Sequence, residues 1–170
     1  MRMTEAVRVC VLLFSLVGCA DAEKSKGGDE CDSSIASADR IVGTVDGEEW
    51  DGAPVIWMWA GDSIQATSEE EDGWRMTFFL QATEDGLTMR DLEEGGALPA
   101  TVDLGSDDAG VTLYTDDGDS YTTGADAPGS LTITQMDDAT LEACFSFTAE
   151  SSLGVTVEIS EGAFYAGLFE

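Results

Sequence analysis

Apolar and polar residues alternate along most of the chain after residue 40. From Trp74 to Gln81, positions 74, 76, 78 and 80 are apolar and positions 75, 77 and 81 are polar. A period of two places successive side chains on opposite faces of a strand, so this segment predicts a strand with one buried face. Residues 54–60 are apolar on both faces, which predicts a central strand. Similar alternation follows in residues 131–134, 141–148 and 155–160.

Turn-forming pairs separate these segments at short intervals. An Asp-Gly pair joins residues 41–45 to residues 48–50 in a predicted opening hairpin. The pair occurs five times, at 46–47, 51–52, 72–73, 85–86 and 117–118. Short strands rich in β-branched and aromatic residues, with turns between them, predict an all-β fold: an antiparallel β-sandwich, with a β-barrel as the alternative. No window shows the helical period that a crossover between parallel strands needs.

The N-terminal segment follows a different pattern. Arg2 and Arg8 precede an apolar run from Val9 to Val17, as in a secretion signal. A helix of that run would rise only about 15 Å, roughly half a bilayer core, which argues against a permanent membrane span. The end of this run leads into Leu16-Val17-Gly18-Cys19, which resembles the lipobox of bacterial lipoproteins. The resemblance implies that residues 1–18 are a cleaved signal and that Cys19 carries fatty acyl chains such as palmitate.

The lipid on Cys19 sets the expected location. Two or three acyl chains hold a protein stably on a membrane without spanning it. In lipoproteins, an Asp directly after the lipidated cysteine retains the protein at the inner membrane, whereas this chain has Ala20 there. The resemblance therefore implies the outer membrane of a bacterial cell envelope. Residues 19–40 are small and polar, which predicts a flexible tether, and residues 41–170 form one predicted all-β domain.

The β-rich part is similar to small β-rich lipoprotein domains of bacterial envelopes. The matching segments are Gly43–Trp50, Gly129–Thr134, Phe145–Ala149 and Glu161–Phe164. The similarity covers most of residues 41–166. It implies an all-β fold but no activity, since that group of domains has no assigned activity to carry over.

Composition excludes several kinds of chemistry. The chain has no histidine, which rules out Ser-His-Asp and Cys-His catalysis and histidine-ligated metal sites. Its two lysines, Lys24 and Lys26, lie in the predicted tether, which argues against a Ser-Lys dyad. The formal net charge of −28 repels nucleic acid and anionic lipid surfaces. We therefore expect a protein that is not an enzyme and does not bind nucleic acid.

Acidic clusters fall at the predicted turns, and Asp116, Asp117 and Asp119 form the candidate calcium site among them. Calcium prefers six to eight oxygen ligands, which carboxylates in a loop can supply. This loop lacks the alternating order and distal Glu of a calcium-binding loop, and turn formation explains its Asp-Gly pair without a metal. No other cofactor is expected.

Trp57 and Trp59 share one face of the predicted strand 54–60. If exposed, they would form a platform on which sugar rings stack. Their apolar neighbours favour the alternative, in which both belong to the core.

Cys31 and Cys144 remain after Cys10 leaves with the signal and Cys19 is lipidated. An even pair in an oxidising compartment predicts a disulfide, with two unpaired thiols as the alternative. In residues 141–148 the odd-numbered positions are apolar and must face the core, so Cys144 is expected to point outward. A disulfide to Cys31 would then pin the tether to the domain.

Three functions remain compatible with these observations. The first is a tethered, non-catalytic module with a structural or protein-binding role. The second is a carbohydrate-binding module with the Trp57/Trp59 platform, aided by calcium. The third is a hydrolase that uses two carboxylates. The absence of histidine and the small size favour the first, with an unidentified protein or glycan as its partner.

Overall fold

The computed structural model describes residues 39–52, 55–68 and 74–168. The predicted signal, Cys19 and Cys31 lie outside the described residues. The elements are β1 (Arg40–Val45), β2 (Glu48–Gly52), β3 (Val55–Ala60), β4 (Ser63–Ser68), β5 (Trp74–Leu80), α1 (Met89–Glu93), β6 (Ala100–Leu104), β7 (Ala109–Thr115), β8 (Ser120–Thr122), β9 (Gly129–Met136), β10 (Thr140–Ser151) and β11 (Thr156–Leu168). The prediction of an all-β fold is confirmed.

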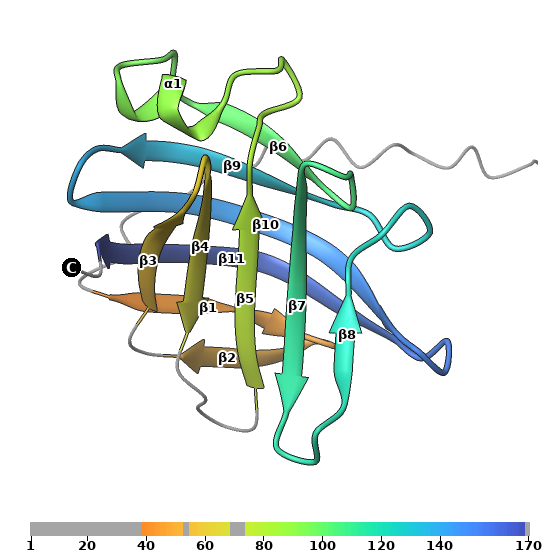
Figure 1. The fold of residues 1–170 in the computed structure, drawn as a ribbon. Coiled ribbons are helices and arrows are strands. Elements are labelled where there is room, and N and C mark those ends of the chain that lie inside the picture. Colours follow the sequence, from red (N-terminus) through yellow and green to blue (C-terminus); the bar gives the residue numbers. More distant parts are fainter. Residues whose placement is uncertain (1–38, 53–54, 69–73, 169–170) are drawn as a thin grey trace, which may run out of the picture.

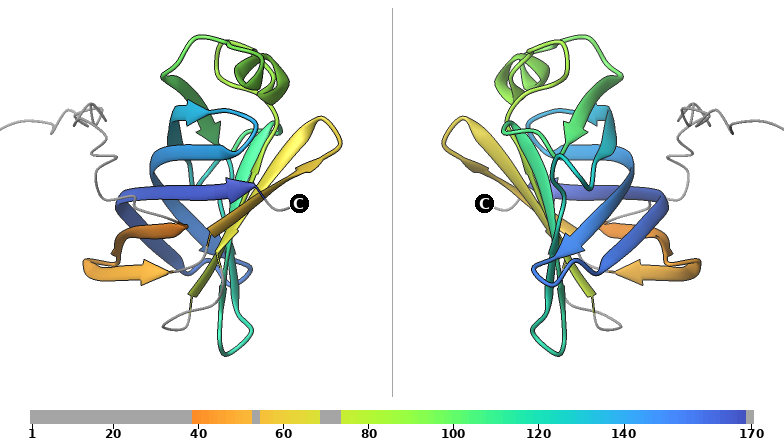
Figure 2. Two further views of the ribbon diagram at one scale, coloured as in Figure 1. Left: turned by 90° about the vertical axis from the view of Figure 1, so that its left-hand side faces the viewer. Right: turned by 90° about the vertical axis from the view of Figure 1, so that its right-hand side faces the viewer.

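The strands form two layers that cross each other. Hydrogen bonding links them in the order β2-β1-β11-β3-β4-β5-β7-β8-β10-β9-β6, and an additional pairing between β10 and β11 closes a ring of strands. The front layer of Figure 1 consists of β3, β4, β5, β7 and β8, and the rear layer of β1, β2, β6, β9, β10 and β11. Figure 2 shows the layers from the side, with α1 at one end.

The sheet is mixed, whereas the sequence predicted antiparallel pairing throughout. β11 pairs in parallel with β3, through Gly167 with Ile56 and Leu168 with Trp57. β1 runs antiparallel to β11, and one hairpin reverses the chain between β1 and β2. β2 therefore runs in the same direction as β11, and β3 does so too.

The core fills the space between the two layers. Alternation in β5 and β10 is confirmed, since Met76, Phe78 and Leu80 are buried in β5, as are the odd-numbered residues of β10 from Leu141 to Ala149. The ring centroid of Phe78 lies 5.0 Å from that of Phe145 and 5.2 Å from that of Phe164. These edge-to-face and tilted contacts lock the front layer to β10 and β11.

Two of the predicted Asp-Gly turns illustrate where the pattern holds and where it fails. Asp46 and Gly47 have φ of 49° and 84° and form the tight turn between β1 and β2. Asp51-Gly52 is not a turn, because it belongs to β2, where Gly52 pairs with Ile41. A Cβ on Gly52 would lie 2.7 Å from the Trp50 ring, so the glycine here makes room for a tryptophan.

The sequence did not predict the short helix α1. Its N-cap is Thr88, whose hydroxyl accepts a hydrogen bond from the Asp91 amide while the Asp91 carboxylate accepts one from the Thr88 amide. This capping box is readable as Thr-x-x-Asp, but the helix after it is too short to show a period. Within the described residues, no helix is long and apolar enough to cross a membrane.

Candidate binding face

The outward side chains of the front layer form one continuous surface, which we call the front face. Its positions alternate with buried ones along each strand, as the burial patterns of these strands show. The front face consists of Ile56, Met58, Gln65, Thr67, Arg75, Thr77, Phe79, Gly110, Thr112, Tyr114, Ser120 and Thr122. None of these residues is acidic, although the chain contains 35 Asp and Glu.

A row of four threonines crosses the front face. Thr67 pairs with Thr77, Thr77 with Thr112, and Thr112 with Thr122, so the row runs straight across β4, β5, β7 and β8. Adjacent strands lie about 4.8 Å apart, which sets the spacing of the hydroxyl and methyl groups. The Thr67 and Thr77 hydroxyl oxygens are 3.4 Å apart. The row gives the face a level, uncharged centre.

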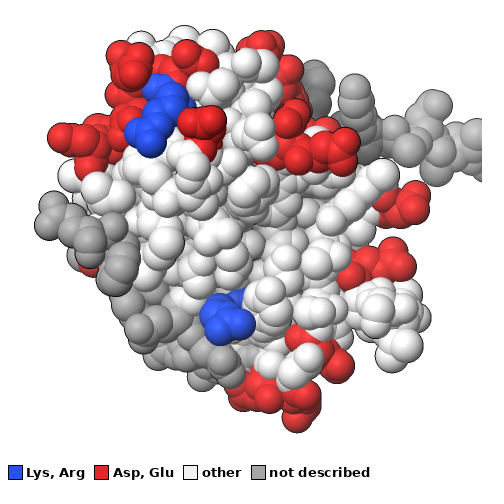
Figure 3. Space-filling model, in the orientation of Figure 1, with Lys and Arg blue, Asp and Glu red and all other residues white. Residues whose placement is uncertain are grey.

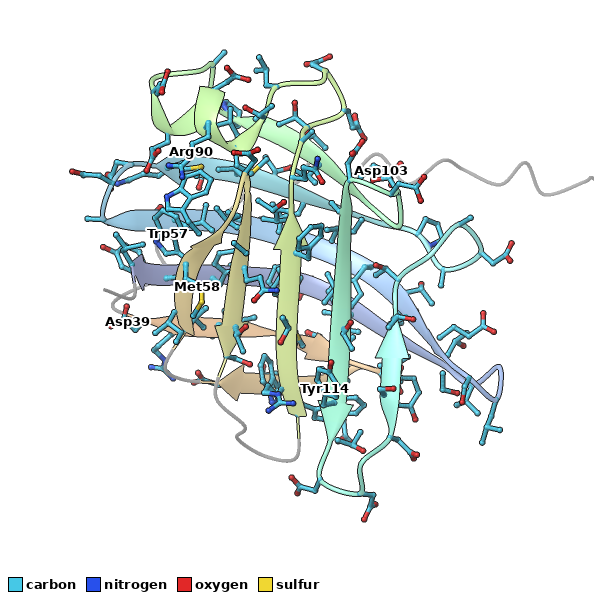
Figure 4. The ribbon with its side chains drawn as sticks, viewed as in Figure 1. Asp39, Trp57, Met58, Arg90, Asp103 and Tyr114 are labelled. Atoms are coloured by element: carbon cyan, nitrogen blue, oxygen red, sulfur yellow. The ribbon has the colours of Figure 1, made fainter. Side chains whose placement is uncertain are left out.

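Exposed apolar surface is concentrated on this face. Met58, Phe79 and Tyr114 expose 36%, 37% and 36% of their surface, and they are three of the five large hydrophobic residues that are exposed in the described part of the chain. The other two, Leu153 and Val155, lie together near the β10–β11 turn. Figure 4 labels Met58 on β3 and Tyr114 on β7, on opposite sides of the front layer.

Arg75 is the single charge of the front face. Its guanidinium carbon lies 4.5 Å from the centroid of the Tyr114 ring. The other two arginines in the described ranges form ion pairs, Arg40 with Asp51 and Arg90 with Glu93. Among the described residues, no carboxylate lies within ion-pair distance of Arg75.

Carboxylates surround the front face instead of lying on it. Asp62 is in the β3–β4 turn, Asp108 directly precedes β7, and Asp116 follows it. All three are exposed. Figure 3 shows the result as a white central surface with red groups along its margin. We call these three residues, at the ends of front-layer strands, the acidic rim.

Trp57 and Trp59 do not form an exposed platform. Trp57 has no exposed surface, because its side of β3 faces the core, and its indole Nε1 has no hydrogen-bond partner among the described residues. Trp59 is partly buried, with the Arg90 guanidinium carbon 3.4 Å from its ring centroid and its Nε1 donating to Glu93 Oε1 at 3.3 Å. The core interpretation therefore holds for Trp57, and Trp59 attaches α1 to β3.

Asp116, Asp117 and Asp119 lie in the β7–β8 hairpin turn. The Gly118 amide donates to the Thr115 carbonyl, and the Asp119 amide donates to the Thr115 hydroxyl. Gly118 has the φ of 85° that such a turn requires. Within the described residues, no three carboxylate or thiol side chains come together in a group that could hold a metal ion.

Hydrogen bonds lower the pKa of two carboxyl groups. In Asp91, a hydrogen bond from the Thr88 hydroxyl and one from the Thr88 amide lower the pKa. In Asp137, a hydrogen bond from the Ala139 amide is the main cause of the lowered pKa. A general acid needs the opposite, a raised pKa. No carboxylate in the described ranges is buried, although Asp126 and Glu150 line an open groove beside β8.

Cys144 lies on the outward side of β10, between the core residues Ala143 and Phe145, as predicted. It is part of a disulfide bond. No other cysteine lies in the described ranges, so the pairing with Cys31 stays a prediction, as does the lipidation of Cys19.

Sequence reasoning missed the front face, although a signal for it exists. The segments that became β3, β4, β5, β7 and β8 contain no acidic residue, which is also true of β1 and β9 in the rear layer, whereas β2, β6, β10 and β11 each contain at least one. No protein-family model matches this chain, and neither curated proteins nor solved structures give a significant match. The function must therefore be argued from the geometry of the domain itself.

Proposed function

We propose that this chain is a lipoprotein of the bacterial cell envelope whose β-domain is a non-catalytic protein-binding module. The lipid on Cys19 would hold it at the outer membrane, and the front face would bind the partner. The observation that carries the proposal is an acid-free, partly apolar face on a chain with 35 acidic residues.

The composition of the face supports a protein partner. Surfaces designed for solubility are given roughly 25–35% charged residues, whereas the front face has one charged residue, Arg75. Centres of protein interfaces are depleted in Asp, Glu and Lys and enriched in aromatic residues, Met and Arg. Tyr114, Phe79, Met58 and Arg75 belong to the enriched classes. Surfaces of this kind rarely persist on a protein that has no partner for them.

A glycan partner has less support. The Trp57 ring is buried, and the aromatic rings of the front face belong to residues that expose only 37% and 36% of their surface, Phe79 and Tyr114. A sugar ring stacks on a fully open aromatic face. A protein partner can instead contact the threonine row, the thioether of Met58 and the ring edges of Phe79 and Tyr114 at the same time.

Site-specific photo-crosslinking tests the proposal. The full-length lipoprotein, with the photoreactive residue p-benzoylphenylalanine in place of Tyr114, is produced in the native bacterium and irradiated in intact cells. The control carries the same residue in place of Val155, which is exposed but lies outside the front face. We expect a discrete protein adduct from position 114 and none from position 155. Equal adducts from both positions, or none from position 114, would contradict the proposal.

A further inference from the structure

We infer that the partner has an uncharged docking centre surrounded by basic residues, and that it is a protein other than a second copy of this chain. The inference rests on the proposed function, since it names the chemistry of the partner that the front face binds. It follows from the charges around the face.

The acidic rim is free to interact. Asp62, Asp108 and Asp116 are exposed, and no described Arg lies within ion-pair distance of any of them. They lie at both ends of the front-layer strands, Asp108 before β7 and Asp116 after it. The rim therefore presents uncompensated negative charge on opposite sides of an uncharged centre.

Dimensions decide whether a partner meets this rim. β7 has seven residues, and at about 3.4 Å per residue its ends lie roughly 20 Å apart. A typical interface covers about 800 Å² on each partner, which corresponds to roughly 30 Å across. A partner seated on the front face therefore extends over both ends of the strands. The margin of the partner then lies close to the acidic rim, within about one electrostatic screening length, which is about 8 Å at physiological salt.

A second copy fits this charge pattern poorly. Two front faces placed against each other would set one acidic rim against another, between chains that each carry a formal charge of −28. A margin of Lys and Arg would instead gain attraction and speed association. The pattern around the face thus favours a basic partner.

Arg75, which lies beside the threonine row on β5, sets a further requirement for the partner. Its guanidinium is stacked on Tyr114 and has no described carboxylate in range, so its donors lose water when a partner covers them. A buried donor that stays unpaired is costly. The partner should therefore place a carbonyl oxygen opposite Arg75.

The test measures how salt changes the adduct from position 114. Envelopes isolated from the crosslinking strain are irradiated at about 0.05, 0.15 and 0.5 M NaCl, a range over which the screening length falls severalfold. We expect the yield to fall several-fold as salt rises. We also expect mass spectrometry to identify a protein whose docking region is rich in Lys and Arg.

Matched charge variants complete the design. The rim variant replaces three acids by amides, and the control variant does the same to three acids of the rear layer. The substitutions are Asp62→Asn, Asp108→Asn and Asp116→Asn in the rim variant, and Glu49→Gln, Glu142→Gln and Glu158→Gln in the control. The rim variant should lower the yield several-fold at low salt and flatten its salt dependence. The control should do neither.

The outcomes separate the two proposals. A position-specific adduct whose yield is constant or rises with salt overturns the inference but leaves the proposed function standing. An adduct with a second copy of the chain, or an equal effect of both variants, also overturns the inference alone. Absence of any adduct specific to position 114 overturns both.

Discussion

Arg75 and Tyr114 are direct cross-strand partners on β5 and β7, and the guanidinium carbon of the first lies 4.5 Å from the ring centroid of the second. The contact fixes the one cation of the front face to one of its three exposed hydrophobic side chains. An arginine held in this way keeps most of its N–H donors free while losing less rotamer freedom on binding.

Replacing Arg75 distinguishes its cation–π contact within the domain from its proposed contact with the partner. In Arg75→Gln, loss of the cation–π contact should lower the free energy of unfolding by only about 0.5–1 kcal/mol. The partner adduct from position 79, tested with p-benzoylphenylalanine in place of Phe79, should fall much more. Arg75→Lys keeps the charge but not the planar fork, so it should restore the adduct only in part. If the adduct yield in Arg75→Gln equals that of the protein with Arg75 intact, Arg75 does not contribute to partner binding.

A charge in the threonine row should block binding without unfolding the domain. Thr77 is the second member of the row and only partly buried, so Thr77→Glu places a carboxylate at the centre of the front face. Thr101→Glu is the matched control, since Thr101 has the same intermediate exposure but lies on β6 of the rear layer. We expect thermal unfolding to change little in either variant, and the adduct from position 114 to disappear in Thr77→Glu alone. Loss of the adduct in both would indicate a general charge effect.

Gly162 tests the packing between β11 and the core. A Cβ at this position would lie 2.2 Å from Cε2 of Phe145, whose ring contacts Phe78. Gly162→Ala should therefore destabilise the domain by about 1–3 kcal/mol, as overpacking does. Gly110→Ala is the control, because its Cβ would meet only the Thr123 hydroxyl at 3.5 Å. Denaturant unfolding of both variants measures the difference, and equal stabilities would contradict the close contact.

Asp137 gives a prediction on pH. Hydrogen bonds from the Ala139 and Thr140 amides lower the pKa of its carboxyl from the ordinary value of 3.8. A lowered folded-state pKa means that the stabilisation is complete above 3.8 and is lost as the pH falls through the lowered value. Asp137→Asn should therefore reduce stability at pH near 7 and differ less from the unmodified protein in strong acid. A difference that is constant with pH would contradict the role of the charged form.

The predicted disulfide between Cys31 and Cys144 can be checked by peptide mapping without reduction. A linked pair of peptides that contain these two cysteines is the expected result. Closing a loop of more than a hundred residues stabilises a domain by at most about 4–5 kcal/mol in the chain-entropy model, so Cys31→Ser should lower the unfolding temperature. Reactive thiols at both Cys31 and Cys144 in the unreduced protein would contradict the pairing.

Local patterns identified several of the strands, but they did not single out β4, β6, β7 or β8, and they did not show which strands are neighbours. The alternation in residues 74–81 and 141–148 predicted which side chains of β5 and β10 are buried. The Asp51-Gly52 pair misled because its glycine accommodates Trp50, a contact that no local turn rule contains. The parallel joint of β11 with β3 depends on residues more than a hundred positions apart.

The front face could not be assembled from the sequence for the same reason. Thr67 and Thr122 are far apart in the chain, and only the pairing of β4, β5, β7 and β8 places them in one row. The absence of acidic residues from these segments could be read from the sequence. The sequence did not show that the outward side chains of these segments lie on one face of the sheet. Burial of Trp57 likewise follows from which face of β3 meets the core, whereas periodicity showed only that Trp57 and Trp59 share a side.

Because β11 pairs with β1, β3 and β10, the last of the described strands is the one on which the first described strands depend. Apart from each other and β11, β1 and β2 have no described neighbours in the sheet, so they join it only through residues 159–165 of β11. Contacts of this sequence separation slow folding. The hairpin of β1 and β2 can therefore join the sheet only when the whole of the described domain has been synthesised.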